Sequence, residues 1–302
     1  MFRYYAWALS EKTFSYVPFG RRLALATCDW MTKDRGSCQS FTTTFRVVRK
    51  VGESTPPNGK ILDVGTGWFH HDAFLIYLLP GPYTVYLCDI EDRANLRAIH
   101  NYLENLVVNR DRVCAELGIS VDAFDRKIRP LLALNTREEI YRQCNFVPCI
   151  VPHPERLFLP RESIDFVVGS CVLNHIRPDL LSLEVRNLRE ILKPDGYMFF
   201  LIGHEDHWSF HDSSANPFNY YRYSDVYYRR FFETEFEYHN RMVKEEWFEL
   251  FRDIPLSVRE YSANITDQTR SAIERLPHID ARFARFPRED LAIAHSYFLL
   301  AK

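Results

Sequence analysis

The stretch that decides the fold is Lys60-Ile-Leu-Asp-Val-Gly-Thr-Gly-Trp-Phe69. A short β-prone run, Ile61 to Val64, leads into a Gly-x-Gly turn. An apolar, helix-like segment from Ala73 to Leu79 follows, and a second predicted strand, Thr84 to Cys88, then ends at the acid Asp89. The order of strand, glycine turn, helix, strand and acid is typical of the first half of a nucleotide-binding α/β sheet.

The composition narrows the class of protein. With 302 residues, of which 46% are hydrophobic, the chain can bury a full core. Its net charge of −2 provides no overall field that favours nucleic acid or a membrane surface. The seven cysteines include no CxxC pair, which indicates reduced thiols. No signal peptide or membrane span is recognised, so we expect a cytoplasmic protein.

Strands and helices alternate along the chain. Five further strands are predicted after the first two, at 146–151, 163–170, 197–202, 256–261 and 293–300. Helical spacing of apolar residues predicts helices between them, for example at 93–108 and 180–192. Alternation of this kind predicts a Rossmann-like α/β fold, a seven-stranded and mostly parallel sheet with helices on both faces.

Two kinds of segment lie outside this sheet. Residues 1–58 are predicted to form an N-terminal helical cap, with helices near residues 4–9, 21–30 and 41–51, before the main domain at 59–302. Two insertions, at about 110–143 and 204–250, are expected to cover the sheet. The second insertion is rich in tyrosine and histidine, which could line a pocket for an organic substrate or simply pack the covering helices.

The glycine turn suits a ligand that approaches the backbone closely. Gly65 and Gly67 carry no side chain, and an acid about 20 residues further on can accept hydrogen bonds from ribose hydroxyls. A dinucleotide fingerprint would need a third glycine at the position of His70. The carboxylate of Asp63 would repel a pyrophosphate but could accept from an ammonium group. The turn therefore favours S-adenosylmethionine over a dinucleotide.

Four motifs in this order resemble those of class I S-adenosylmethionine-dependent methyltransferases. They are Ile61-Leu-Asp-Val-Gly-Thr-Gly67, Val85-Tyr-Leu-Cys-Asp-Ile90, the stretch Ile164 to Ile176, and Leu188-Arg-Glu-Ile-Leu-Lys-Pro-Asp-Gly196. The resemblance covers residues 58–302. The Gly-Thr-Gly-Trp form of the turn is similar to a bacterial subgroup with small-molecule or natural-product-like substrates.

The resemblance implies S-adenosylmethionine as the cofactor and S-adenosylhomocysteine as its product. It places the cofactor-binding residues in the glycine turn, at the end of the second strand and after the fourth strand: Asp63, Gly65, Thr66, Gly67, Trp68, Asp89, Ile90, Ser170 and Cys171. Backbone groups or His153, after the third strand, are expected to hold the adenine.

Methyl transfer from a sulfonium is an in-line displacement that needs alignment of the reactants and, for a hydroxyl or carbon acid, a base. His204 and His207 follow the fifth strand and are the candidate bases, with Asp206 to orient an imidazole. The alternative is that they hydrogen-bond the covering loops. The candidate substrate-binding residues are His175, His211, Tyr220 and Tyr223. The His204 to His211 run could also supply metal ligands, but its spacing differs from HExxH and no metal is expected.

We therefore expect S-adenosylmethionine-dependent methyl transfer to a small organic molecule. The expected partner is that substrate, with neither nucleic acid nor membrane, and a homodimer stays open. Two other functions fit parts of the sequence. A nicotinamide-dependent oxidoreductase shares the fold, although His70 and Asp63 argue against it. A non-catalytic interaction protein would keep the fold without needing His204 or His207.

Overall fold

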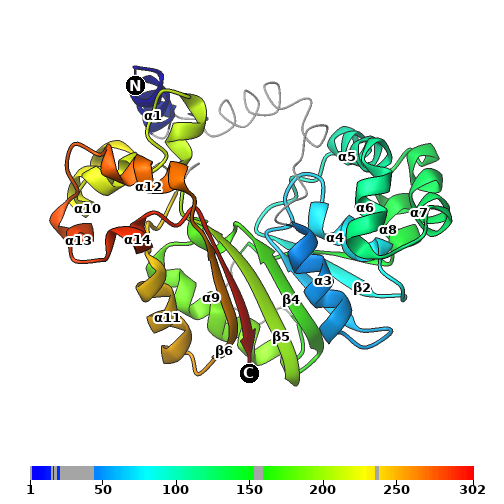
Figure 1. Cartoon of the computed structure of the whole chain (residues 1–302). Helices are drawn as coiled ribbons and strands as arrows, with labels where there is room; N and C mark the ends of the chain where they lie inside the picture. The colour runs from blue at the N-terminus through cyan, green and yellow to red at the C-terminus, as the bar shows by residue number, and fades with distance from the viewer. Residues whose placement is uncertain (1, 15, 17–18, 21–43, 153–158, 235–237) are drawn as a thin grey trace.

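The computed structural model describes residues 2–14, 16, 19–20, 44–152, 159–234 and 238–302 (Figure 1). The helix predicted at 21–30 and the adenine contact predicted for His153 lie outside the described residues. Within them, the chain forms one seven-stranded sheet with helices packed on both of its faces.

The sheet confirms the predicted fold class. Its strand order is β3-β2-β1-β4-β5-β7-β6. The strands from β3 to β5 run parallel, whereas β7 lies antiparallel between β5 and β6. The strands are β1 (Lys60–Val64), β2 (Thr84–Asp89), β3 (Phe146–Ile150), β4 (Ile164–Ser170), β5 (Leu192–Gly203), β6 (Ser257–Asn264) and β7 (His295–Ala301).

Alternation of side chains along the central strands produces two hydrophobic cores. In β5, Phe199 and Leu201 point into one core, whereas Met198, Phe200 and Ile202 point into the other. Helices that cover the first face are α3 (Thr44–Ser54), α4 (His71–Leu78), α5 (Leu96–Val108), α6 (Arg110–Leu117), α7 (Val121–Ile128) and α8 (Arg137–Cys144). The second face is covered by α9 (Pro178–Ile191) and α11 (Lys244–Asp253).

A third hydrophobic cluster forms an aromatic lobe beside the sheet. Tyr4, Trp208, Tyr220, Tyr221 and Phe283 are among its buried members. The lobe is built from α1 (Phe2–Phe14), the 3-10 turns η3 (His207–His211) and η4 (Asn219–Arg222), α10 (Asp225–Phe231), α12 (Asp267–Glu274), α13 (Ala281–Ala284) and α14 (Arg288–Leu291). Figure 1 shows α1, α10 and α12 to α14 gathered at the opposite side of the sheet from α5 to α8.

The predicted N-terminal cap does not pack as one unit in the described residues. Helix α1 belongs to the aromatic lobe, whereas Val47, Val48 and Val51 of α3 are buried in the first core. The division of the chain at residue 58 stays a prediction. The segment predicted as the first insertion forms α6, α7, α8 and the 3-10 turn η1 (Arg129–Ala133), and its apolar side chains extend the first core. No described helix has the length and apolar character needed to cross a membrane.

Candidate active site

The glycine turn after β1 has the backbone conformation that only glycine adopts without strain. Gly65 has φ 67° and Gly67 has φ 66°. A Cβ on Gly65 would lie 2.3 Å from Cγ2 of Val172, in the loop after β4, so this residue must be glycine for the two loops to meet. Within the described part of the chain, a Cβ on Gly67 would come within 4 Å of the Gly65 carbonyl oxygen alone, at 3.8 Å. The turn therefore leaves an open cradle over Gly67.

Asp89 ends β2 beside this cradle. Its Oδ2 accepts a hydrogen bond from the Gly67 N–H (3.0 Å), and its Oδ1 accepts from the Ile90 N–H (2.8 Å). Burial raises the pKa of the Asp89 carboxyl, and the two backbone donors oppose that rise. A cavity of about 130 Å³ adjoins Asp89 and is also lined by Pro148 and Ile150 of β3. We expect the ribose of an adenosine at Asp89 and its base in this cavity.

Asp63 is enclosed below the turn. Only 2% of its surface is exposed, and its Oδ2 accepts from the Thr66 hydroxyl (2.9 Å). Since that hydroxyl donates to Asp63, it accepts from Nδ1 of His70 (2.8 Å), which leaves Nε2 of His70 to accept from the Tyr141 hydroxyl (2.8 Å). Burial raises the pKa of Asp63. This carboxylate therefore braces the turn through Thr66, and its contact with a cofactor ammonium stays a prediction.

His70 also takes part in shaping the turn. Its φ of 52° is left-handed, so the position of the third fingerprint glycine keeps a glycine-like conformation without being glycine. Burial lowers the pKa of the His70 imidazole to about 4, which keeps the ring neutral in its hydrogen-bonded position. Trp68, on the other side of the turn, lies under the guanidinium of Arg93, 5.9 Å from its ring centroid.

The loop after β4 faces the turn. Ser170 Oγ is buried without a hydrogen-bond partner among the described residues. Cys171 has φ 55°, a strained conformation for a residue with a side chain, and its N–H donates to Leu201 O (2.8 Å). Burial raises the pKa of the Cys171 thiol to about 12. The open cradle at Gly67, the acid Asp89 and the orphaned Ser170 hydroxyl fit an adenosyl cofactor with hydrogen-bonding ribose hydroxyls.

His204 directly follows β5 and is buried. Its Nε2 lies 2.9 Å from Ser296 Oγ and its Nδ1 lies 3.2 Å from Met242 O. Burial lowers the pKa of this imidazole to about 4. Both ring nitrogens are thus engaged by the protein, as in the alternative interpretation of the sequence, and neither is available to take a proton from a substrate in this conformation.

Asp206 and His211 hold α1 in place. Oδ2 of Asp206 accepts from the Tyr4 hydroxyl (2.7 Å), and its Oδ1 accepts from the Trp208 N–H (3.1 Å) at the start of η3. The ring of His211 stacks on Trp7 with 4.6 Å between centroids. Burial raises the pKa of the Asp206 carboxyl to about 7. The Asp206 carboxylate therefore contacts a tyrosine of the first helix and not the imidazole predicted from the sequence.

His207 lies in a group of three imidazoles. Its ring centroid is 4.7 Å from that of His175, in the loop after β4, and 5.0 Å from that of His239. Nδ1 of His239 accepts from the Arg241 N–H (3.2 Å), so its neutral form carries the proton on Nε2. His239 was not predicted as a site residue, and no local motif marks it, because only tertiary packing brings it to this edge.

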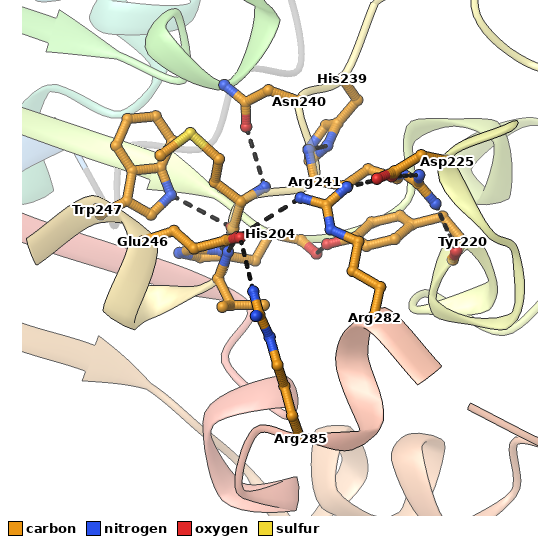
Figure 2. Close-up of polar contacts among 12 residues, drawn as sticks. His204, Tyr220, Asp225, His239, Asn240, Arg241, Glu246, Trp247, Arg282 and Arg285 are labelled. Atoms are coloured by element: carbon orange, nitrogen blue, oxygen red, sulfur yellow. Dashed lines mark hydrogen bonds and ion pairs between the residues drawn. The ribbon is translucent and has the colours of Figure 1, made fainter. Parts of the chain in front are cut away.

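Arg241 fixes the segment that carries His239 (Figure 2). Its buried guanidinium donates to the carbonyl oxygens of Tyr220 (3.2 Å) and Tyr223 (2.8 Å) and pairs with Asp225. It also lies 4.1 Å from the ring centroid of Tyr228. Figure 2 shows the Asp225 carboxylate in contact with both Arg241 and Arg282. No local sequence pattern indicates the buried Arg241 cation, which joins the 239–242 segment to the aromatic lobe.

Tyr220 and Tyr223 pack inside that lobe. The Tyr220 side chain is fully buried and its hydroxyl donates to His204 O. The Tyr223 hydroxyl lies 2.7 Å from the Tyr5 hydroxyl of α1. Both positions fit the packing role considered for the tyrosines, and their predicted role in substrate binding stays a prediction. No group of three or more His, Cys, Asp or Glu side chains in the described ranges could hold a metal ion.

The comparison with protein families identifies the class. The family described as "methyltransferase domain" matches residues 39–252. This match spans well over half of the chain, and the protein therefore belongs to the methyltransferase domain family. A search of curated proteins finds no match.

Solved structures share the fold at low sequence identity. Phosphoethanolamine N-methyltransferase 2 of Haemonchus contortus, solved with S-adenosyl-L-methionine, is 12% identical with a TM-score of 0.50, over 97% of this chain and 60% of that one. An S-adenosylmethionine-dependent methyltransferase from Mesorhizobium loti is 13% identical (TM-score 0.48, 88% and 99% covered). Another, from Methanosarcina mazei, is 13% identical (TM-score 0.44, 84% and 96% covered). At such identities the likeness shows the fold alone. Family and fold together make S-adenosylmethionine the cofactor of this protein.

Proposed function

We propose that the protein transfers a methyl group from S-adenosylmethionine to a small organic acceptor, with His207 as the general base. One observation carries this proposal: at the carboxyl edge of the sheet, the partly exposed His207 lies among the imidazoles that face the loop after β4, whereas His204 and Asp206 are tied to other groups. In open α/β sheets ligands bind beyond the carboxyl ends of the strands.

The cofactor is expected to lie across the glycine turn. The backbone of Gly65 and Gly67 would cradle it, and the Asp89 carboxylate, next to the open space at Gly67, would accept from the ribose hydroxyls. The side chain of Ile90 is 57% exposed beside Asp89 and offers an apolar surface for the adenine. When bound, S-adenosylmethionine supplies an electrophilic methyl group on a sulfonium.

On the acceptor side, His207 would remove the proton that the substrate loses as its heteroatom or carbon takes the methyl group. Burial and the neighbouring imidazoles lower the pKa of His239 well below its usual value, so that ring stays neutral. Burial raises the pKa of the Glu205 carboxyl, and the nearby His207 opposes that rise. Glu205 is thus the acid available to stabilise a protonated His207, the role that the sequence suggested for Asp206.

The substrate is proposed to be small and organic. The net charge of −2 gives no overall attraction for a nucleic acid. An aromatic side chain of the lobe, Tyr220, lies beside the imidazoles, with 5.3 Å between its ring centroid and that of His239. A homodimer and a cytoplasmic location stay predictions.

Calorimetric titration with S-adenosylhomocysteine tests the cofactor assignment. The wild-type protein should bind it, and Asp89→Ala should weaken binding by about 10- to 100-fold, since charge-assisted hydrogen bonds to the ribose are lost. Thermal unfolding of Asp89→Ala would verify that it folds. Absence of binding by the wild type, or equal binding by the variant, would contradict the proposal. Incubation of cell extracts with labelled S-adenosylmethionine, read by mass spectrometry, would then identify the acceptor.

A further inference from the structure

A second buried acid lies beside the glycine turn, in the first turn of α4. Asp72 is only 1% exposed, and its Oδ1 makes no hydrogen bond within the described residues. Among the described residues, Nε2 of His71 lies 3.4 Å from this oxygen. A carboxylate removed from water without hydrogen bonds is costly and rare in native proteins. Such an atom indicates a ligand that is polar and positively charged.

The neighbours of Asp72 place it on the cofactor side of the sheet edge. Its charge raises the pKa of Asp63 at the end of β1, of the Cys171 thiol after β4, and of the Tyr102 hydroxyl in α5. Asp72 therefore lies near the end of β1, the loop after β4 and α5, whose Tyr102 hydroxyl donates to the carbonyl oxygen of the adjacent His71 (3.2 Å). Asp89 marks the ribose end of the cofactor site at β2, on the other side of β1. The order of the strands thus puts Asp72 toward the end of the cofactor that extends away from the ribose.

That end of the cofactor is an amino acid with an α-ammonium group. Asp63, the acid first predicted to meet this ammonium, already accepts from the Thr66 hydroxyl and is occupied in bracing the turn. Asp72 has the same charge, similar burial and an unused acceptor atom. An ammonium presents three N–H donors and forms strong, short bonds to carboxylate oxygens.

We propose that Asp72 is the residue that binds the α-ammonium group of the cofactor, through its unpaired Oδ1. The inference rests on the proposed cofactor site and names the residue that binds one charged group of the cofactor. The α-ammonium donates to Oδ1 and compensates a buried negative charge that His71, at 3.4 Å, does not hydrogen-bond. Asp63 stabilises the glycine turn by accepting a hydrogen bond from the Thr66 hydroxyl.

The ordinary alternative is that Asp72 serves only the helix. An acid in the first turn of α4 interacts favourably with the partial positive charge of the helix N-terminus and with the adjacent His71. In that case removing its charge would change stability, but it would affect ligands with and without an ammonium equally. The two roles are therefore separated by ligands that differ only in this group.

The experiment is a thermodynamic cycle that combines one substitution in the protein with the removal of one group from the ligand. S-adenosylhomocysteine and its desamino analogue are titrated calorimetrically into the wild type and Asp72→Asn. Loss of the ammonium should weaken binding to the wild type by about 10- to 100-fold, as for a charge-assisted hydrogen bond. The same loss should change binding to Asp72→Asn by less than about threefold. An equal penalty in both proteins would overturn the assignment.

Two controls keep the result interpretable. Methylthioadenosine lacks the whole amino-acid part, so its affinity should be unchanged in Asp72→Asn if the site is folded. If Asp72→Asn does not fold, Asp72→Ser replaces it in the cycle and should likewise lose most of the ammonium penalty, while His71→Gln should keep all of it. A larger loss of the penalty in His71→Gln than in the Asp72 variant would also overturn the assignment. Failure of the wild type to bind any of these adenosyl ligands would instead contradict the cofactor site as a whole.

Discussion

The glycine turn (Asp63 to His70) and the histidine loop (His204 to His211) are built from similar residues. The side chains of the turn contact near neighbours in the sequence, whereas those of the loop contact distant segments. In the turn, a buried acid and a buried histidine are joined through Thr66, within eight positions of the chain, from Asp63 to His70. In the loop, Asp206 bonds Tyr4, which is 202 positions away, and His204 bonds Ser296, which is 92 positions away. A local network leaves a readable sequence motif, whereas a network made across the fold does not.

The largest expected effect separates the two histidines of the loop. His207→Gln should lower kcat by about 100- to 10,000-fold, because it removes the proposed base. It should leave the affinity for S-adenosylhomocysteine unchanged, since the role proposed for His207 is in proton removal from the acceptor and not in cofactor binding. Single-turnover methyl transfer, once an acceptor is known, gives the rate.

His204→Gln is the matched variant for that comparison. It should destabilise the fold by about 1–3 kcal/mol, because Ser296 and the Met242 carbonyl lose their partner in a buried place. Its kcat in the fraction that remains folded should stay close to that of the wild type. If instead His204→Gln abolished turnover and His207→Gln did not, the assignment of the base would be reversed.

The next effect concerns the Asp206 carboxyl and pH. Its pKa is about 7 in the folded protein and about 3.9 in an unfolded chain. At pH values between these two pKa values, the folded state therefore holds a proton that the unfolded state has lost. Stability from this group is thus present at low pH and decreases as pH rises toward 7. Relative to Asp206→Asn, the wild type should lose about 1.4 kcal/mol of unfolding free energy for each pH unit between 5 and 7.

Urea unfolding of both proteins at pH 5, 6 and 7 measures this difference. Comparison with the asparagine variant removes the contributions of other groups, such as His70 and His204, whose lowered pKa values make stability rise with pH. Parallel pH profiles for the two proteins would show that the bond between Tyr4 and Asp206 does not depend on the charge of Asp206.

The smallest effect tests the cradle in the glycine turn. Gly67→Ala forces a side chain into φ 66° and should cost about 1–2 kcal/mol of stability. The added methyl group also enters the space expected for the cofactor, so the affinity for S-adenosylhomocysteine should decrease. Gly118 ends α6 with φ 64° and has no atom within 4 Å of a built Cβ. Gly118→Ala should therefore show the same strain with unchanged ligand affinity, and a similar loss of affinity in both variants would argue against the cradle.

Local chemistry explains how much of the fold could be predicted. The strands of the sheet were recognisable from apolar runs and turn residues, and only their ends differ. Helix α5 begins at Leu96 and not at Arg93, because the Asn95 side chain accepts from the N–H groups of Arg97 and Ala98 and caps the helix there. Strand β5 begins early, at Leu192, because that residue pairs with Ile164 across a bulge.

The site was less predictable, for a physical reason. Asp89 and the glycines follow from backbone conformation and strand ends, which are local properties. The identity of the partner of Asp206, the position of His239 and the burial of Asp72 depend on which segments meet in space. Helix α1, predicted as part of a cap, supplies the tyrosine that occupies Asp206, and no pattern near residue 206 could indicate a partner at residue 4.

The place of β3 at the edge of the sheet has a consequence for self-association. An edge strand exposes unpaired N–H and C=O groups that can recruit another strand. In β3 the Val151 N–H points inward to Asp89 O (2.8 Å), so by alternation the nitrogen of Pro148 faces outward, and proline has no hydrogen to donate there. Pro148 therefore interrupts the row of outward-facing N–H donors on β3, which disfavours extension of the sheet by another strand at this edge.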